Sequence, residues 1–170
     1  MTALYPARPD EAIESTTTEG ETSSGALLEM ALTAEQSAQS FYTALAGKFK
    51  TYEKTFLRLA EDEARHAATY SELLRTEGRV ATSKDKEIAE SRIRALVGMG
   101  IMDALKGPDV SEVEDLRAAV ELALKLEQNT LLFYQNLLLY FANGYQDQIH
   151  KIVDVEYDHM LQLSRIDYFE

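Results

Sequence analysis

Apolar residues recur at steps of three and four along four stretches of the chain, which is the spacing of one face of an α-helix. No segment shows a convincing strand pattern, although valine and isoleucine are scattered throughout. The pattern therefore predicts an all-α protein with four long helices. The expected helices run from about Ala26 to Lys48, Tyr52 to Glu77, Ser111 to Ala142 and Tyr145 to Tyr168.

The connections between these helices differ in length. The first and third are short turns, whereas about thirty residues, 79–110, separate the second helix from the third. This crossover begins polar and then becomes apolar, with a pattern compatible with further helix over Ile93–Leu105. A short, long, short order is typical of a four-helix bundle made of two antiparallel helical hairpins joined by a crossover.

Two further local signals set the expected boundaries. Ser111 is followed three residues later by Glu114, the spacing of a capping box, so we expect the third helix to begin at Ser111. At the start of the chain, residues 1–24 are polar and offer little to bury, so we interpret them as a mobile lead-in. Residues 25–170 then form one domain, which is a suitable length for a single hydrophobic core.

The two predicted hairpins repeat one another. A shift of 92 residues aligns the first helix with the third, and a shift of 93 aligns the second with the fourth. Shared helical composition explains a few identities, but not so readily the alignment of both polar motifs. The aligned polar pairs are Glu35 with Glu127, Tyr42 with Tyr134, Glu63 with Glu156 and His66 with His159.

Carboxylates and imidazoles interrupt the apolar faces of all four helices. Glu63 and His66 are three residues apart and so point off one helix face, as do Glu156 and His159. A lone carboxylate in an apolar stripe costs several kcal/mol unless it is paired or binds a metal ion. Residues equidistant from a hairpin turn face each other, so Glu35 should meet Glu63 and His66. Glu127 should likewise meet Glu156 and His159, and the repeat places both groups at matching heights.

This constellation predicts a site for two metal ions. Four carboxylates cannot stay ionised together in a dry core, because each raises the pKa of the others. Two divalent cations balance the four negative charges, and each imidazole adds a neutral nitrogen ligand. Oxygen-rich ligation without sulfur suits iron or manganese better than structural zinc. The alternative is a coincidence of ion pairs and core histidines. The predicted ligands are Glu35, Glu63, His66, Glu127, Glu156 and His159.

Three neighbouring side chains need separate interpretations. Tyr42 and Tyr134 follow Glu35 and Glu127 by two turns on the same face. They are either core aromatics, or functional groups that hydrogen-bond to ligand carboxylates or act as redox-active phenols near the site. His150 lies nine residues before His159, which places it on the opposite face of the helix. We therefore expect His150 at the surface.

Composition limits the partners and the compartment. The net charge of −12 makes nucleic acid and anionic membranes poor partners, and the absence of cysteine excludes disulfides, thiol catalysis and iron–sulfur clusters from these residues. No segment is apolar enough to cross a bilayer. We expect a cytoplasmic protein.

The paired Glu-x-x-His motifs, each with its partner glutamate and tyrosine, resemble the di-iron carboxylate proteins of the ferritin-like superfamily. The pattern is most similar to the rubrerythrin-like group and covers about 25–168. The resemblance implies two iron ions, with manganese or zinc as substitutes. It also implies a non-haem oxidoreductase that reduces hydrogen peroxide or oxygen.

Two departures from the rubrerythrin pattern matter for function. Rubrerythrins proper carry a four-cysteine rubredoxin module, so this chain should need an external electron donor such as a rubredoxin-like protein. They also carry a further glutamate one turn after the third-helix ligand, where this chain has Thr130. Alternatives are a ferroxidase for iron storage or delivery, and a metal-stabilised structural module without turnover. The apolar, long crossover also predicts a homodimer, with exchange of hairpins between chains as one form of it.

Overall fold

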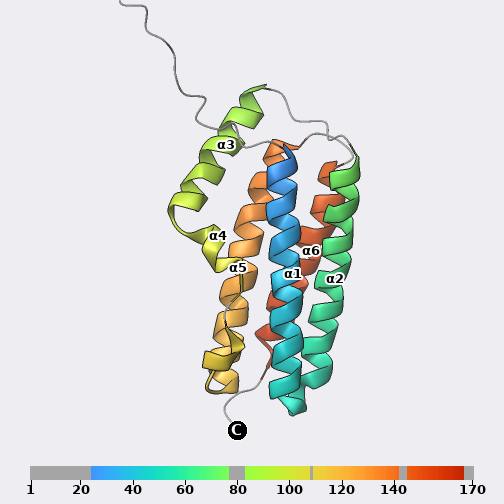
Figure 1. Ribbon diagram of the computed structural model, residues 1–170, viewed down its shortest axis with the longest axis vertical. Coiled ribbons are helices and arrows are strands. Elements are labelled where there is room, and N and C mark those ends of the chain that lie inside the picture. The colour runs from blue at the N-terminus through green and yellow to red at the C-terminus, as the bar shows by residue number, and fades with distance from the viewer. Residues whose placement is uncertain (1–23, 77–82, 108, 142–144, 167–170) are drawn as a thin grey trace, which may run out of the picture.

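Four long helices form the core of the protein, and their presence confirms the predicted all-α four-helix bundle (Figure 1). The structure, a computed structural model, describes residues 24–76, 83–107, 109–141 and 145–166. The long helices are α1 (Ser24–Lys48), α2 (Glu53–Arg75), α5 (Leu116–Tyr140) and α6 (Tyr145–Leu163). The predicted lead-in lies outside the described residues except for Ser24. The predicted end of the fourth helix near Tyr168 is too late, because α6 ends at Leu163 and the i→i+3 hydrogen bonds of Arg165 and Ile166 close a turn there.

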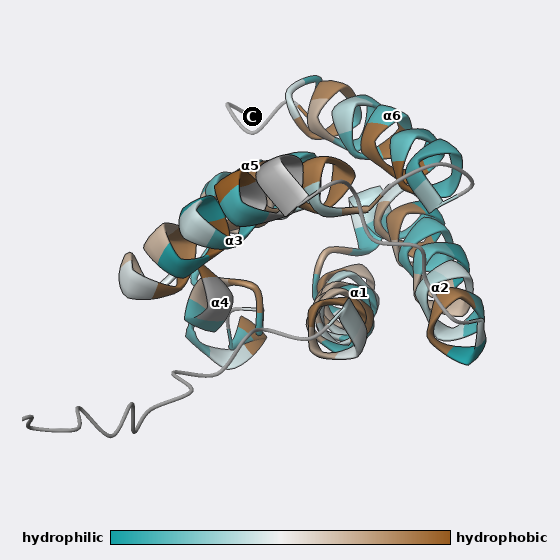
Figure 2. Cartoon of the chain, turned by 90° about the horizontal axis from the view of Figure 1, so that it is seen from above, coloured by the Kyte–Doolittle hydropathy of each residue, from teal (hydrophilic) through white to brown (hydrophobic). Residues whose placement is uncertain are grey.

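The bundle consists of two antiparallel hairpins, as the sequence predicts. Phe49 and the short 3-10 turn η1 (Lys50–Tyr52) link α1 to α2, which pack along each other. The second hairpin pairs α5 with α6. Viewed end-on, α1 faces α5 and α2 faces α6, so the four helices enclose one shared core (Figure 2).

The crossover contains two helices, α3 (Ser83–Gly98) and α4 (Ile101–Ala104), which lie outside the bundle beside α5. Buried Ile93, Leu96 and Leu105 fasten this segment to the bundle. Gly100 separates the two helices with a φ of 75°, a left-handed conformation that glycine adopts without a side-chain clash. The predicted helical character of the crossover is therefore confirmed.

The predicted start of the third helix is wrong. Residues Val110–Glu112 form a separate 3-10 turn, η2, and Val113 continues from it in an extended conformation with its side chain buried. Helix α5 begins only after Asp115, whose carboxylate accepts a hydrogen bond from the Ala118 backbone N–H at 2.8 Å. Burial of Val113 and capping by Asp115 thus displace the capping box expected at Ser111.

Apolar side chains fill the bundle as two clusters, one toward each end. One cluster includes Leu27, Leu73 and Phe141, and the other includes Leu45, Phe56 and Leu163. The buried glutamates and histidines lie between them in the sequence of every long helix. The two clusters therefore exclude water from both ends of the polar layer.

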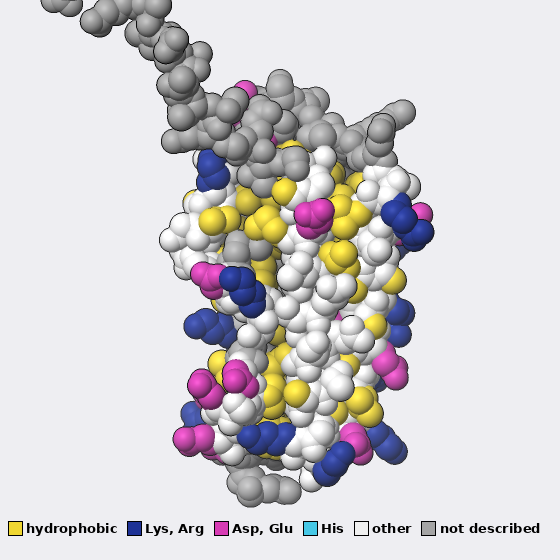
Figure 3. All heavy atoms as spheres, viewed as in Figure 1, with side chains coloured by type: hydrophobic (Ala, Val, Ile, Leu, Met, Phe, Trp, Pro, Cys, Tyr) yellow, Lys and Arg dark blue, Asp and Glu magenta, His cyan; other side chains and the backbone are white. Residues whose placement is uncertain are grey.

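The outer surface carries charges of both signs. On the face shown in Figure 3, acidic and basic side chains are interspersed and do not gather into one large patch. None of the helices in the described residues combines the length and the apolar character needed to span a membrane.

Candidate metal centre

All six predicted ligands lie together in the middle of the bundle, and none is more than 6% exposed. Helix α1 supplies one glutamate, and α5 supplies another. Helices α2 and α6 each supply a glutamate and a histidine one turn apart, because the spacing of three residues places both on one face. In chain order these residues are Glu35, Glu63, His66, Glu127, Glu156 and His159.

The six side chains form two overlapping groups of four. Within each group, one possible ligand atom from every residue lies within 4.8 Å of the others. Glu63 and Glu156 belong to both groups, so each can bridge two ions. We name the groups by their histidines. The His66 subsite comprises Glu35, Glu63, His66 and Glu156, and the His159 subsite comprises Glu63, Glu127, Glu156 and His159.

Both imidazoles present Nδ1 to the carboxylates. Nδ1 of His66 lies 2.9 Å from Oε1 of Glu156 and 3.3 Å from Oε2 of Glu63. Nδ1 of His159 lies 3.1 Å from Oε2 of Glu156 and 3.2 Å from Oε1 of Glu63. Each shared glutamate therefore turns one oxygen toward each histidine, which is the arrangement required of a carboxylate between two ions.

The subsites also differ from the pairing expected from the hairpins. The sequence places Glu35 with Glu63 and His66, and the structure agrees, with Oε2 of Glu35 3.6 Å from Nδ1 of His66. However, each subsite draws its fourth residue from the other hairpin. Glu156 joins the His66 subsite, and Glu63 joins the His159 subsite. The centre therefore depends on contact between the hairpins, which folding of one hairpin alone does not provide.

Two fully buried tyrosines hydrogen-bond across the bundle to the unshared glutamates. The hydroxyl of Tyr42 donates to Glu127, and the hydroxyl of Tyr134 donates to Glu35. Of the two interpretations that the sequence leaves open, the structure shows the hydrogen bond. The crossed pairing follows from the internal repeat, because a two-fold relation between the hairpins makes the two bonds equivalent.

The electrostatics of the centre reflect crowded charges in a dry environment. Burial, together with Glu156, raises the pKa of Glu127 to about 8. Burial also raises the pKa of Glu63 well above its usual value, assisted by the charges of Glu156 and Glu35. For both histidines, burial favours the neutral ring, but the neighbouring carboxylates outweigh it and raise each pKa to about 12. Without cations the centre therefore retains protons.

The donor set fits two metal ions. Several buried atoms that face the centre have no hydrogen-bond partner among the described residues, and a polar atom left in this state is costly. Cations would satisfy these atoms and replace the retained protons. Four carboxylates balance two divalent ions, and each subsite offers carboxylate oxygens with one imidazole nitrogen. These atoms have ion-pair contacts within the centre but no hydrogen bond; they are Oε2 of Glu35, Oε1 of Glu63, Nδ1 of His66 and Oε1 of Glu156.

Sequence reasoning missed one contact to the centre. Oδ2 of Asp62 lies 3.4 Å from Nε2 of His159, the ring nitrogen opposite Nδ1. The other carboxylate oxygen of Asp62 pairs with Arg65 at the surface. Asp62 directly precedes Glu63, so it points about 100° away on the helix and lies outside the apolar stripe that revealed the ligands. The sequence signal for Asp62 is a break in the internal repeat, because the shift of 93 residues that aligns Glu63 with Glu156 aligns Asp62 with Val155.

Two residues singled out from the sequence lie where expected. His150 is exposed on α6, away from buried His159. Thr130 is buried one turn after Glu127, and its hydroxyl donates to the Leu126 carbonyl at 3.0 Å. Thr130 therefore adds no further charged ligand to the centre.

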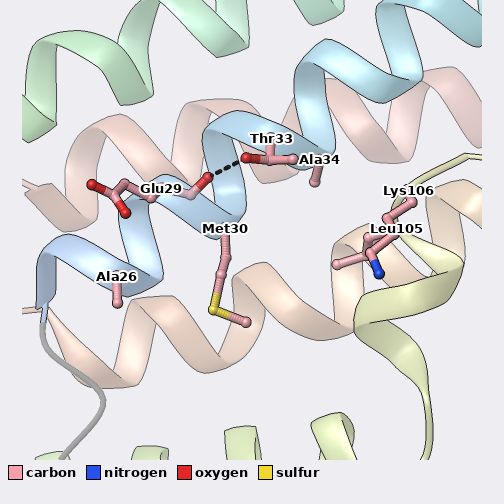
Figure 4. Close-up of a pocket in the computed structure, with 7 residues that line it drawn as sticks. All are labelled: Ala26, Glu29, Met30, Thr33, Ala34, Leu105 and Lys106. Carbon is pink, nitrogen blue, oxygen red and sulfur yellow. Dashed lines mark hydrogen bonds between the residues drawn. The ribbon is translucent and has the colours of Figure 1, made fainter.

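A separate open pocket of about 370 Å³ lies between α1 and the end of the crossover (Figure 4). Its polar side includes Thr33, whose hydroxyl donates to the Glu29 carbonyl at 2.8 Å. None of the six predicted ligands lines it, so the metal centre is distinct from this surface pocket. The lining residues are Ala26, Glu29, Met30, Thr33, Ala34, Leu105 and Lys106.

The fold and centre define a ferritin-like bundle with a carboxylate-rich site for two metal ions. A family model described as rubrerythrin matches residues 26–166, and the chain belongs to this family. Among solved structures, a Thermotoga maritima protein described as a ferritin-like diiron-carboxylate protein has a similar fold, with a TM-score of 0.61. The sequences are 22% identical over 82% of this chain and 91% of that chain. No curated protein matches the chain.

Proposed function

We propose that this protein is a non-haem di-iron oxidoreductase that reduces hydrogen peroxide or oxygen with electrons from an external donor. The observation that carries this proposal is the pair of overlapping subsites that share Glu63 and Glu156. Carboxylates that face two ions can change their binding mode as the charge of the ions changes, so the protein need not rebuild the centre in each cycle. Membership of the rubrerythrin family supports the same assignment.

The six ligands would hold two iron ions, for which manganese or zinc could substitute. Two ferrous ions supply two electrons when bound, which matches the reduction of one hydrogen peroxide molecule, with two protons, to two water molecules. Tyr42 and Tyr134 orient the unshared carboxylates, and each keeps a hydroxyl proton beside the centre. Burial of all six ligands excludes bulk water and thereby limits side reactions.

Under this proposal the electrons enter from outside these 170 residues. The 170 residues contain no cysteine, so they hold no rubredoxin-type iron site. A rubredoxin-like protein or a small reductant would therefore return the centre to its reduced state after each turnover.

Iron oxidation for storage or delivery is the second candidate. The observation that favours it is Thr130, which occupies the position of the further glutamate expected from the rubrerythrin resemblance and bonds to its own helix. With one fewer carboxylate, the centre has less charge to stabilise repeated redox cycling. Ferrous iron would then be the substrate, and oxygen or peroxide the oxidant.

A stopped-flow experiment separates these functions. Anaerobic protein loaded with ferrous iron is mixed with a small excess of hydrogen peroxide, in parallel with oxygen, and a reductant is then supplied. Repeated turnover supports the oxidoreductase, and many ferric ions retained per chain support iron storage. One oxidation that neither repeats nor accumulates iron would leave a structural metal site and contradict both functions. The Glu63→Ala variant, which lacks a shared ligand, is the control for reaction at the centre.

We also propose that the protein is a homodimer. Part of the apolar crossover is used within the chain, since Ile93, Leu96 and Leu105 are buried. However, Val97 and Met99 remain 50% and 65% exposed on the same segment. These side chains, or an exchange of hairpins across the long crossover, would join two copies. Light scattering at micromolar concentration should return a dimer, whereas a monomer would contradict the proposal.

A further inference from the structure

The two subsites are related by the internal repeat, but their histidines have different surroundings. Asp62 on α2 faces Nε2 of His159 at 3.4 Å. The repeat places Val155 of α6 at the equivalent position for His66, and the side chain of valine has no atom that accepts a hydrogen bond. The centre is therefore symmetric in its six ligands and asymmetric in what supports them.

The support that Asp62 gives is specific. Nδ1 of His159 faces Glu63, Glu127 and Glu156, so metal binding through Nδ1 leaves the ring proton on Nε2. This nitrogen is fully buried and forms no hydrogen bond among the described residues, so its 3.4 Å contact with Oδ2 of Asp62 is an ion-pair contact. Asp62 is thus the carboxylate placed to accept the Nε2 proton when a metal ion binds Nδ1, and this acceptance would fix the tautomer and orientation of the ring, a common arrangement for metal-bound histidines.

Asp62 is itself held in place from outside. Its side chain is 15% exposed, and Oδ1 pairs with the guanidinium of Arg65, which is 66% exposed. The ion pair leaves Oδ2 directed at His159. The ring of His159 is completely buried, whereas the side chain of His66 retains 7% exposure. The His159 subsite is therefore the more enclosed of the two, and only its histidine has this additional carboxylate contact among the described residues.

We infer that the two subsites bind metal unequally, with Asp62 as the positioning residue that makes the His159 subsite the tighter one. The first ion enters the His159 subsite, and the ion in the His66 subsite is the one that exchanges with solution. This inference rests on the metal binding in the proposed function. Loss of an outer partner of a metal ligand typically weakens binding by about 10–100-fold, which sets the expected size of the effect.

The repeat offers a matched pair of substitutions. Asp62→Asn removes the carboxylate charge beside His159, and Val155→Asp supplies a carboxylate beside His66. Asp158→Asn is the control, because Asp158 is an exposed acidic residue next to His159 in sequence and its replacement changes the net charge equally. Each variant, after removal of bound metal with a chelator, is titrated with Co²⁺ alone. Calorimetry gives the stepwise affinities, and the Co²⁺ absorption spectrum reports the coordination at each step.

The wild type should bind two Co²⁺ ions in two steps. The dissociation constants of the two steps should differ by more than the statistical factor expected for two equal sites. Asp62→Asn should weaken the tight step by about 10–100-fold and alter its spectrum, while Asp158→Asn leaves both steps unchanged. The double variant with Val155→Asp should regain a tight step. In this double variant, adding His66→Ala should abolish the tight step and adding His159→Ala should leave it intact. In the wild type, His159→Ala should abolish the tight step and His66→Ala should leave it intact.

Failure of the inference and failure of the proposed function give different results. A wild type that binds no Co²⁺ contradicts both. Two ions bound with equal affinity, or a tight step that Asp62→Asn leaves intact, overturn only the inequality of the subsites. Equal loss of both steps in Asp62→Asn would mean that Asp62 supports the fold and does not position His159. The midpoint of thermal unfolding of each metal-free variant identifies such a loss of stability.

Discussion

Replacing Glu63 with glutamine should change stability in opposite directions in the metal-free and the metal-bound protein. Glu63 is 1% exposed and lies among Glu35, Glu127 and Glu156, so burial and like charges raise its pKa well above the usual value. In the metal-free protein, its carboxyl must hold a proton or remain charged at a cost. Glutamine has nearly the same shape and no charge, so Glu63→Gln should stabilise the metal-free protein.

The magnitudes of the two effects allow a clear test. Replacement of a whole buried ion pair or triad by apolar groups of similar volume gains about 1–4 kcal/mol in favourable cases, which sets the upper limit for neutralising one crowded carboxylate. In the metal-bound protein, an ion at 100 times its Kd adds about 2.7 kcal/mol to stability. Glu63 belongs to both subsites, so its loss removes up to about 5 kcal/mol for the two ions. The metal-bound variant should therefore be less stable than the metal-bound wild type.

Urea denaturation in the presence of a chelator measures the free energy of unfolding of the metal-free protein. The same measurement with saturating Mn²⁺, chosen to avoid redox chemistry, gives the value for the metal-bound protein. Glu61→Gln is the matched control, because Glu61 is exposed on the same helix and its substitution should change stability by less than about 0.5 kcal/mol in either state. The reasoning fails if Glu63→Gln destabilises the metal-free protein by more than the control. It also fails if Mn²⁺ does not stabilise the wild type.

Three further predictions concern the same centre. His150→Ala should leave the metal content at two ions per chain by elemental analysis, while His66→Ala and His159→Ala reduce it; equal loss from all three would contradict the assigned face of α6. The metal-free protein should lose stability as pH rises, because the folded-state pKa values of Glu127, about 8, and of both histidines, about 12, lie above their ordinary values of 4.5 and 6.5. The folded protein then holds more protons than the unfolded chain, so the loss measured by denaturation should begin above about pH 4.5 and continue through pH 8. Thr130→Glu, which restores a carboxylate beside Glu127, should increase peroxide consumption with a rubredoxin-like donor; an unchanged or lower rate would show that more than this ligand separates the chain from a peroxidase cycle.

The sequence by itself determined the bundle and the six residues of the candidate centre. Helical periodicity is a local property, so it places Glu63 and His66 on one face without knowledge of the fold. The repeat then relates this pair to Glu156 and His159, and equal distance from a turn sets the height of Glu35 opposite them. These arguments need only the geometry of one helix and of one hairpin, both of which the chain specifies over short separations.

The tertiary structure decided the contacts between the hairpins. The crossed hydrogen bonds of Tyr42 and Tyr134, and the approach of Asp62 to His159, join residues that no helical period relates. The start of α5 also depended on tertiary packing, because burial of Val113 selected the cap at Asp115. Such contacts depend on the distance and rotation between packed helices. Many side chains along the bundle set these together, and no single segment specifies them.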